Sequence, residues 1–239
     1  MSGVRPRLVL TVGVVVLGWA AMAAAGDRPQ PTSGQTHEPF LPPPVRAGTA
    51  VLYDQYNSPA NFDVTSQDFE PAFDAFDDQG ADDFVVPAGQ TWSVEGVDVD
   101  GEYNGGPAAS FNVLFYANAA FLPGTLVCSR LANPFTVGPA AGDAVITLTS
   151  PCALFPGTYW VSVQARQDFG PAGQWFWQNR TAQAGNPSAW QNPGGAWGGG
   201  CATWGVKTTC LPGQVGPDQV FRINGIIVPV DLQDFTVED

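Results

Sequence analysis

The sequence contains one histidine, His37, and one lysine, Lys207, and charged residues make up only 13% of its 239 residues. There are 9 Lys and Arg against 22 Asp and Glu, so the formal net charge is −13. So few cations cannot neutralise a phosphate backbone, which argues against nucleic-acid binding. A single histidine argues against Ser-His-Asp or Cys-His nucleophile systems and against zinc sites built on several histidines.

The first 25 residues have the pattern of a secretory signal peptide. Arg5 and Arg7 form a positive region, residues 8–19 are an apolar run, and the alanines at 23–25 match a cleavage site. The alternative is an uncleaved membrane anchor, because 18 residues at 8–25 reach the lower limit for a spanning helix. The small residues at the cleavage position favour a signal peptide. We therefore predict a secreted protein, extracellular or periplasmic, with no membrane span after cleavage.

The exported part contains four cysteines. An even number of cysteines in an oxidising compartment predicts two disulfides. We favour the pairs Cys128–Cys152 and Cys201–Cys210, because each pair brackets a local strand-turn-strand stretch. A metal site of four thiolates is the alternative, but the sequence has no C-x-x-C spacing.

The hydrophobic pattern divides the chain into a linker, a domain and a tail. Residues 26–49 are polar and rich in proline, which is typical of an extended linker or arm rather than a folded element. Residues 50–227 are short alternating runs separated by Gly, Pro, Asn and Asp, which predicts about ten strands, with a bulge at Gly96. Residues 228–239 form a C-terminal tail or terminal strand. The expected fold is all-β, a single antiparallel β-sandwich that is jelly-roll-like.

Several strand and turn motifs resemble a broad group of bacterial secreted β-sandwich domains. These domains occur alone, beside extracellular hydrolases or before surface-sorting signals. The motifs are LYDQ at 52–55, ADDFVVPAGQTWSVEGVDVDG at 81–101, SFNVLFYA at 110–117, LPGTLVCS at 122–129, FPGTYWVSVQA at 155–165, WFW at 175–177 and VFRINGI at 220–226. The resemblance implies the fold and export of the domain, and it implies no catalytic residue.

An acidic stretch between Phe73 and Phe84 is a candidate metal site. Five carboxylates repel one another unless water or a cation lies between them, and calcium is the cation that suits irregular oxygen-lined loops outside the cell. The predicted calcium ligands are Asp74, Asp77, Asp78, Asp82 and Asp83. The alternative is a solvated acidic loop without a metal.

A tryptophan-rich stretch is a candidate ligand-binding site. Exposed indoles on a β-sandwich offer flat apolar faces to sugar rings, and amides bind sugar hydroxyls. The predicted ligand-binding residues are Trp175, Trp177, Trp190 and Trp197, with the amides of Asn179, Gln191 and Asn192. The alternative is that these indoles pack in the core or under a flap held by a disulfide.

Three alternating carboxylates, Asp98, Asp100 and Glu102, share one face of a predicted strand. They resemble the E-x-D-x-E strand of jelly-roll glycoside hydrolases, in which one carboxylate attacks the sugar and another protonates the leaving oxygen. The alternative is a polar outer face opposite Val97 and Val99.

These observations favour a secreted, non-enzymatic binding or adhesion module, with a polysaccharide or cell-surface glycan as partner and calcium as the candidate cofactor. A glycoside hydrolase that uses Asp98 and Glu102 is one alternative. A structural envelope or matrix component is another.

Overall fold

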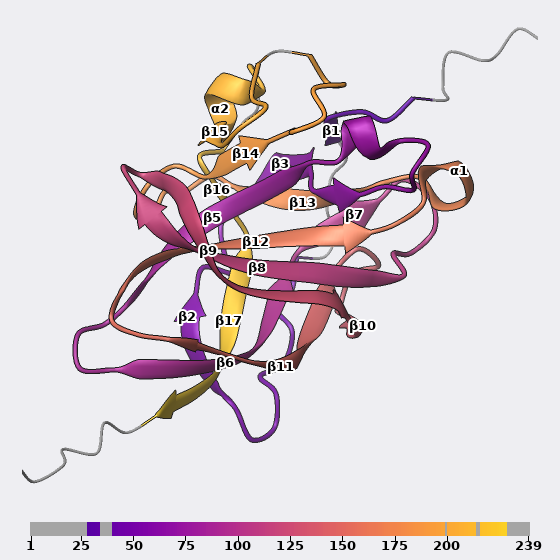
Figure 1. The fold of residues 1–239 in the computed structure, drawn as a ribbon. Coiled ribbons are helices and arrows are strands. Elements are labelled where there is room, and N and C mark those ends of the chain that lie inside the picture. The colour runs from indigo at the N-terminus through magenta and orange to yellow at the C-terminus, as the bar shows by residue number, and fades with distance from the viewer. Residues whose placement is uncertain (1–27, 34–39, 199, 214–215, 229–239) are drawn as a thin grey trace, which may run out of the picture.

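The computed structural model describes residues 28–33, 40–198, 200–213 and 216–228, and these residues form mainly antiparallel strands (Figure 1). The all-β, antiparallel class predicted from the sequence is confirmed. The predicted signal peptide at 1–25, His37 and the predicted tail beyond Val228 lie outside the described residues. Within the described ranges, no helix is long and apolar enough to cross a membrane.

Within the described ranges, the strands form three sheets. The first runs in the order β15 (Gly205–Val206), β14 (Ala189–Gln191), β5 (Gln79–Val86), β12 (Gly157–Arg166), β8 (Ser110–Ala119) and β9 (Leu122–Asn133), with β4 (Gln67–Asp68) parallel to β12. The second runs in the order β10 (Phe135–Val137), β11 (Ala144–Leu154), β6 (Thr91–Val99), β17 (Phe221–Val228) and β2 (Ala50–Asp54). The third runs in the order β1 (Thr32–Ser33), β3 (Pro59–Thr65), β13 (Trp175–Arg180) and β16 (Asp218–Gln219), with β7 (Gly101–Tyr103) also paired to β13. The helical elements are single turns: η1 (Asp74–Phe76), α1 (Phe169–Ala172) and α2 (Lys207–Cys210).

The main core lies where alternating residues of all three sheets meet, an arrangement consistent with a β-sandwich. Figure 1 shows β12 and β8 crossing the middle of the molecule, with β2, β17, β6 and β11 below them. Strand β6 contributes four side chains to the core. Trp92 and Val94 precede Gly96, and Val97 and Val99 follow it. The pairing of β6 with β11 and with β17 shifts between Val94 and Gly96, so the predicted bulge is confirmed.

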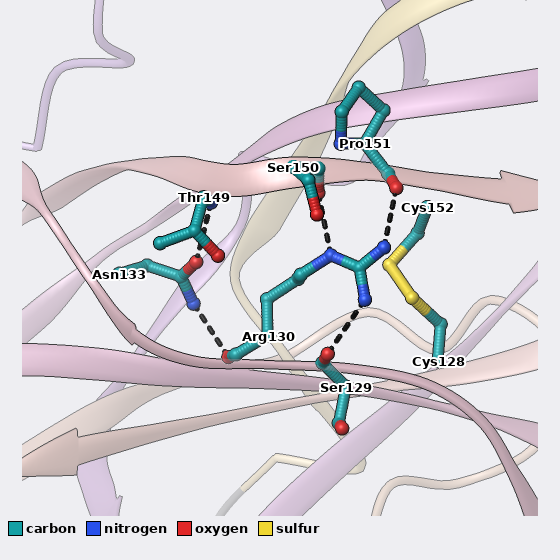
Figure 2. Close-up of a disulfide and its surroundings, with 8 residues drawn as sticks. All are labelled: Cys128, Ser129, Arg130, Asn133, Thr149, Ser150, Pro151 and Cys152. Atoms are coloured by element: carbon teal, nitrogen blue, oxygen red, sulfur yellow. Dashed lines mark hydrogen bonds between the residues drawn. A yellow bond between two sulfur atoms is a disulfide. The ribbon is translucent and has the colours of Figure 1, made fainter.

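Both predicted disulfides, Cys128–Cys152 and Cys201–Cys210, are present. Figure 2 shows how Cys128–Cys152 joins β9 of the first sheet to β11 of the second. Beside it, Arg130 Nε donates to the Ser150 carbonyl at 2.7 Å and Nη2 donates to the Pro151 carbonyl at 2.6 Å. A covalent bond and a guanidinium therefore hold the same two strands together across the sandwich.

The proline-rich segment, predicted as a linker at 26–49, packs against the domain where it is described. Strand β1 pairs with β3, the ring of Phe40 stacks on Tyr56 at 5.5 Å, and the Pro43 carbonyl accepts a hydrogen bond from Arg222. Proline favours extended backbone, which can lie along a sheet without forming a regular strand. This part of the prediction is corrected: the chain is extended as expected, but it is part of the folded structure.

Candidate functional site

An acidic pocket of about 320 Å³ lies between the segment that follows β4 and the loop after β14. Its lining residues are Asp68, Asp74, Asp77, Asp78, Gln79, Gln164, Pro193 and Gly194. Four of the eight are aspartates, so the pocket offers carboxylate oxygens as hydrogen-bond acceptors. We call this hollow the acidic pocket.

Two of the aspartates fix the backbone of the loop that forms the pocket. Asp77 Oδ1 accepts a hydrogen bond from the Phe69 amide, and Asp78 Oδ1 accepts one from the Gln67 amide, both at 2.8 Å. Gln164 on β12 donates to the Asp78 carbonyl at 2.8 Å. The loop between β4 and β5 is therefore closed at its base and anchored to the first sheet.

The carboxyl groups of the pocket differ in burial. Burial raises the pKa of Asp77 to about 6 and raises that of the fully buried Asp78 well above its usual value. Asp68 is more exposed and pairs with Arg166 at 3.2 Å. Two carboxyl groups of the pocket, those of Asp77 and Asp78, therefore hold a proton more strongly than usual.

A pair of aromatic side chains stands beside the acidic pocket. Phe76 of η1 and Trp197 pack edge to face with ring centroids 5.0 Å apart, and Trp197 Nε1 donates to the Phe76 carbonyl at 2.8 Å. Both side chains are partly exposed. They also line a second hollow of about 310 Å³, to which Arg28 contributes. The aromatic pair therefore forms part of the wall of this second hollow.

The structure brings together residues from both predicted sites. Asp74, Asp77 and Asp78 come from the predicted calcium ligands, and Gln191, Asn192 and Trp197 come from the predicted ligand-binding residues. Asn192 Nδ2 donates to the Asp77 carbonyl at 2.7 Å, and Gln191 Nε2 donates to Gln79 Oε1 at 3.0 Å. The tryptophan-rich loop and the acidic loop are therefore two walls of one site.

The sequence prediction missed Asp68, Gln79 and Gln164. Asp68 lies only a few residues before the acidic stretch, and it could have been included by extending that stretch toward the N-terminus. Gln164 lies far away in sequence, and the pairing of β12 with β4 and with β5 brings it to the pocket. The sequence gives no local signal for its role.

The five predicted calcium ligands do not form one site, and this prediction is corrected. Asp82 and Asp83 are consecutive on β5, so their side chains point to opposite faces of the sheet. Asp82 accepts hydrogen bonds from Gln55 Nε2 and the Gln219 amide, whereas Asp83 accepts them from Asn186. In the described part of the chain, no group of three or more His, Cys, Asp or Glu is arranged to hold a metal ion.

Three of the four predicted ligand-binding tryptophans belong to the core. Trp175 and Trp177 are 0% exposed and Trp190 is 1% exposed. Their indole nitrogens donate to the carbonyls of Gly142, Val220 and Thr65, respectively. Strand β13 is buried on both faces, because the third sheet packs on the main core and is itself covered. The prediction of a sugar-stacking surface on these three indoles is therefore wrong.

The predicted amide Asn179 is also buried, at the end of β13. Its Oδ1 accepts a hydrogen bond from Lys207 Nζ at 2.7 Å. Asn179 therefore belongs to a buried polar cluster rather than to a ligand-binding surface.

The predicted catalytic strand is interrupted. Asp98 lies on β6 of the second sheet and Glu102 on β7, which pairs with β13 of the third sheet, so the chain passes between sheets at Asp100. Asp98 is fully buried and accepts hydrogen bonds from Arg222 Nη2 at 2.7 Å and Asn224 Nδ2 at 2.8 Å. An aspartate held in this way supports the fold and is closed to a sugar substrate.

Asp143 is another buried carboxyl group, and the sequence analysis did not single it out. Burial, followed by the nearby charge of Asp100, raises the pKa of Asp143 to about 7. Its Oδ2 accepts a hydrogen bond from the Ala140 amide at 2.9 Å. Asp143 and Asp77 therefore both bind protons more tightly in the folded chain than in the unfolded chain.

We expect the free energy of unfolding to fall as the pH rises from about 4 to about 7, by on the order of 3 kcal/mol from these two groups. A folded-state pKa above the unfolded value means that the stabilisation is complete below the unfolded pKa and is lost as the pH rises through the folded pKa. Asp77 is partly exposed, so water screens its share. Urea denaturation at several pH values measures how the free energy of unfolding changes with pH.

The matched control for this pH dependence is Asp143→Asn, which keeps an oxygen acceptor for the Ala140 amide and removes the titration. The variant should lose less stability than the wild type as the pH approaches 7. Equal slopes for the two proteins would show that Asp143 does not titrate as described.

No protein-family model, curated protein or solved structure matches this chain. Any function therefore has to be inferred from the residues and geometry described above.

Proposed function

We propose that the chain is a secreted, non-enzymatic binding module that takes a hydroxyl-rich ligand, a polysaccharide or cell-surface glycan, in the acidic pocket. The observation that carries this proposal is the convergence of four aspartates and the amide side chains of Gln79 on β5 and Gln164 on β12 on one hollow. The aromatic pair Phe76 and Trp197 stands beside it. Carboxylate and amide oxygens accept hydrogen bonds from hydroxyl groups, and a partly exposed indole can pack on a sugar ring. A volume of about 320 Å³ is at the lower end of the usual range for small-ligand pockets.

The two disulfides support the secreted, extracellular or periplasmic location, because such bonds persist in oxidising compartments. We also propose that the sandwich is jelly-roll-like. Chain neighbours such as β5 and β6, or β11 and β12, lie in different sheets, as expected when consecutive strands alternate between two layers.

Asp74→Asn is expected to weaken glycan retention about tenfold, since it removes one charged hydrogen-bond acceptor from the pocket. Asp74 is exposed on η1 and its substitution should leave the fold intact. The measurement is a glycan array probed with the purified protein, followed by titration of the best ligand. Running the array with calcium and with EDTA separates a calcium-dependent site from a calcium-independent one.

The control is Asp54→Asn, the same change at an exposed aspartate of β2 in the second sheet. This variant should bind as the wild type does. Equal weakening by both substitutions would assign the ligand to some other surface. Failure of the wild type to retain any glycan would reject carbohydrate binding and favour a structural envelope or matrix component.

A further inference from the structure

The only lysine of the chain is fully buried. Lys207 begins α2, and its amide donates to the Ser188 carbonyl while its own carbonyl accepts from the Leu211 amide, both at 2.8 Å. The disulfide Cys201–Cys210 closes the same turn. The backbone of Lys207 is thus fixed, and its side chain points inward rather than into solvent.

The amine of Lys207 touches the side-chain amide of Asn179. Nζ lies 2.7 Å from Asn179 Oδ1 and 3.1 Å from the Asp218 carbonyl, and it also donates to Gln219 Oε1. Asn179 and Gln219 are direct partners in the pairing of β13 with β16, so the sheet presents both amides to the amine. Asn179 and Gln219 are 0% exposed, and bulk water is therefore excluded from this contact.

A buried carboxyl group stands next to this contact. Asp82 is fully buried, and its Oδ2 accepts hydrogen bonds from the Gln219 amide at 2.7 Å and Gln55 Nε2 at 2.6 Å. Gln219 therefore contacts both Lys207 and Asp82. The charge of Asp82 is the strongest electrostatic influence on the Lys207 amine after burial itself.

Burial favours the uncharged forms of both groups. It lowers the pKa of Lys207 to about 7 and raises that of Asp82 well above its usual value. When both groups are uncharged, the protein contains no buried ion pair at this place. A neutral, desolvated lysine amine is also the form that acts as a nucleophile.

We propose that Lys207 and Asn179 are a site of covalent self-modification, in which the lysine amine attacks the asparagine amide and forms an isopeptide bond. A bond forms between Nζ of Lys207 and Cγ of Asn179. The bond from Cγ to Nδ2 breaks, and one amine proton passes to Nδ2, which leaves as ammonia. The step needs no oxidant, metal or second substrate.

The contact geometry fits this step because the nucleophile and the amide are held together before any reaction. Pre-organised neighbours react as if at very high concentration, which is how a poor electrophile such as an amide becomes reactive. The resulting bond would join α2 to β13 and thereby tie the tryptophan-rich loop to the third sheet.

A tryptic map of the reduced and alkylated full chain tests the proposal. Without the bond, trypsin cleaves after Arg166, Arg180, Lys207 and Arg222 and releases peptides 167–180, 181–207 and 208–222. With the bond, trypsin does not cleave at the acylated lysine. We then expect one species with the summed mass of peptides 167–180 and 181–222, less one molecule of ammonia.

Lys207→Arg is the matched control, because it keeps a long polar side chain and a trypsin site and is a far weaker nucleophile. It should release the three separate peptides. Separate peptides from the wild type, with cleavage after Lys207, would overturn the proposal and leave Lys207 as an unmodified side chain that supports the fold. The wild-type map gives this answer even if the variant fails to fold.

Discussion

Replacing Arg222 with alanine is expected to lower the free energy of unfolding by about 3–5 kcal/mol. The substitution leaves Asp98 buried without its closest cation, since Arg222 Nε and Nη2 both donate to Asp98 Oδ2, at 3.0 and 2.7 Å. Arg46 remains, but it lies 3.6 Å from Asp98 and is partly exposed. Arg222 also donates to the Pro43 carbonyl, so the variant should loosen the N-terminal segment. Urea denaturation measures the loss.

Arg166→Ala is the matched control for this effect. Arg166 also pairs with an aspartate, Asp68, at 3.2 Å, but the two side chains are 48% and 34% exposed. An exposed pair contributes about 0–1 kcal/mol. The double variant Asp98→Asn/Arg222→Ala should regain part of the loss, because no unpaired charge remains. A loss at Arg222 as small as that at Arg166 would contradict the assignment of Asp98 as a buried ion.

Trp177→Ala is expected to destabilise the protein by about 3–5 kcal/mol. The indole is fully buried, lies 6.3 Å from the ring of Phe221 and packs against Gly80 of β5. Its removal also takes the hydrogen-bond donor from the Val220 carbonyl, which adds about 1 kcal/mol. Thermal and chemical denaturation report the loss of stability.

The control is Trp204→Ala, because Trp204 is only partly buried and packs at the edge of Tyr116. We expect a loss of no more than about 2 kcal/mol. If Trp177→Ala leaves the stability unchanged and lowers only ligand retention, then Trp177 is a binding residue and the core assignment is wrong.

The features that could be predicted from the sequence depend on local pattern. The bulge in β6 follows from a switch in alternation at Gly96, and each disulfide closes a short local loop. Alternation and turn residues report which side chains share a face, and this information is sufficient for the all-β class. Alternation and turn residues do not show whether another part of the protein packs on that face.

The predictions that failed concern residues whose burial or partners depend on segments far away in sequence. Trp175 and Trp177 share one face, as their spacing predicts, but that face packs on the main core. Strand β3, which pairs with β13, was not predicted, because proline and asparagine interrupt its sequence. The pairing of Asp98 with Arg222 joins residues 124 positions apart and has no local signal.

The bond between Cys128 and Cys152 has a mechanical consequence for a chain that is pulled from its ends. The cysteines are 24 positions apart in sequence, and the chain between them forms a covalent loop that cannot lengthen while the sulfurs remain joined. About 80 Å of chain length therefore cannot extend under force while the disulfide is intact. In a chain under tension, the force would pass through the disulfide rather than through the segment that contains β10. Only reduction of the disulfide would let that segment extend.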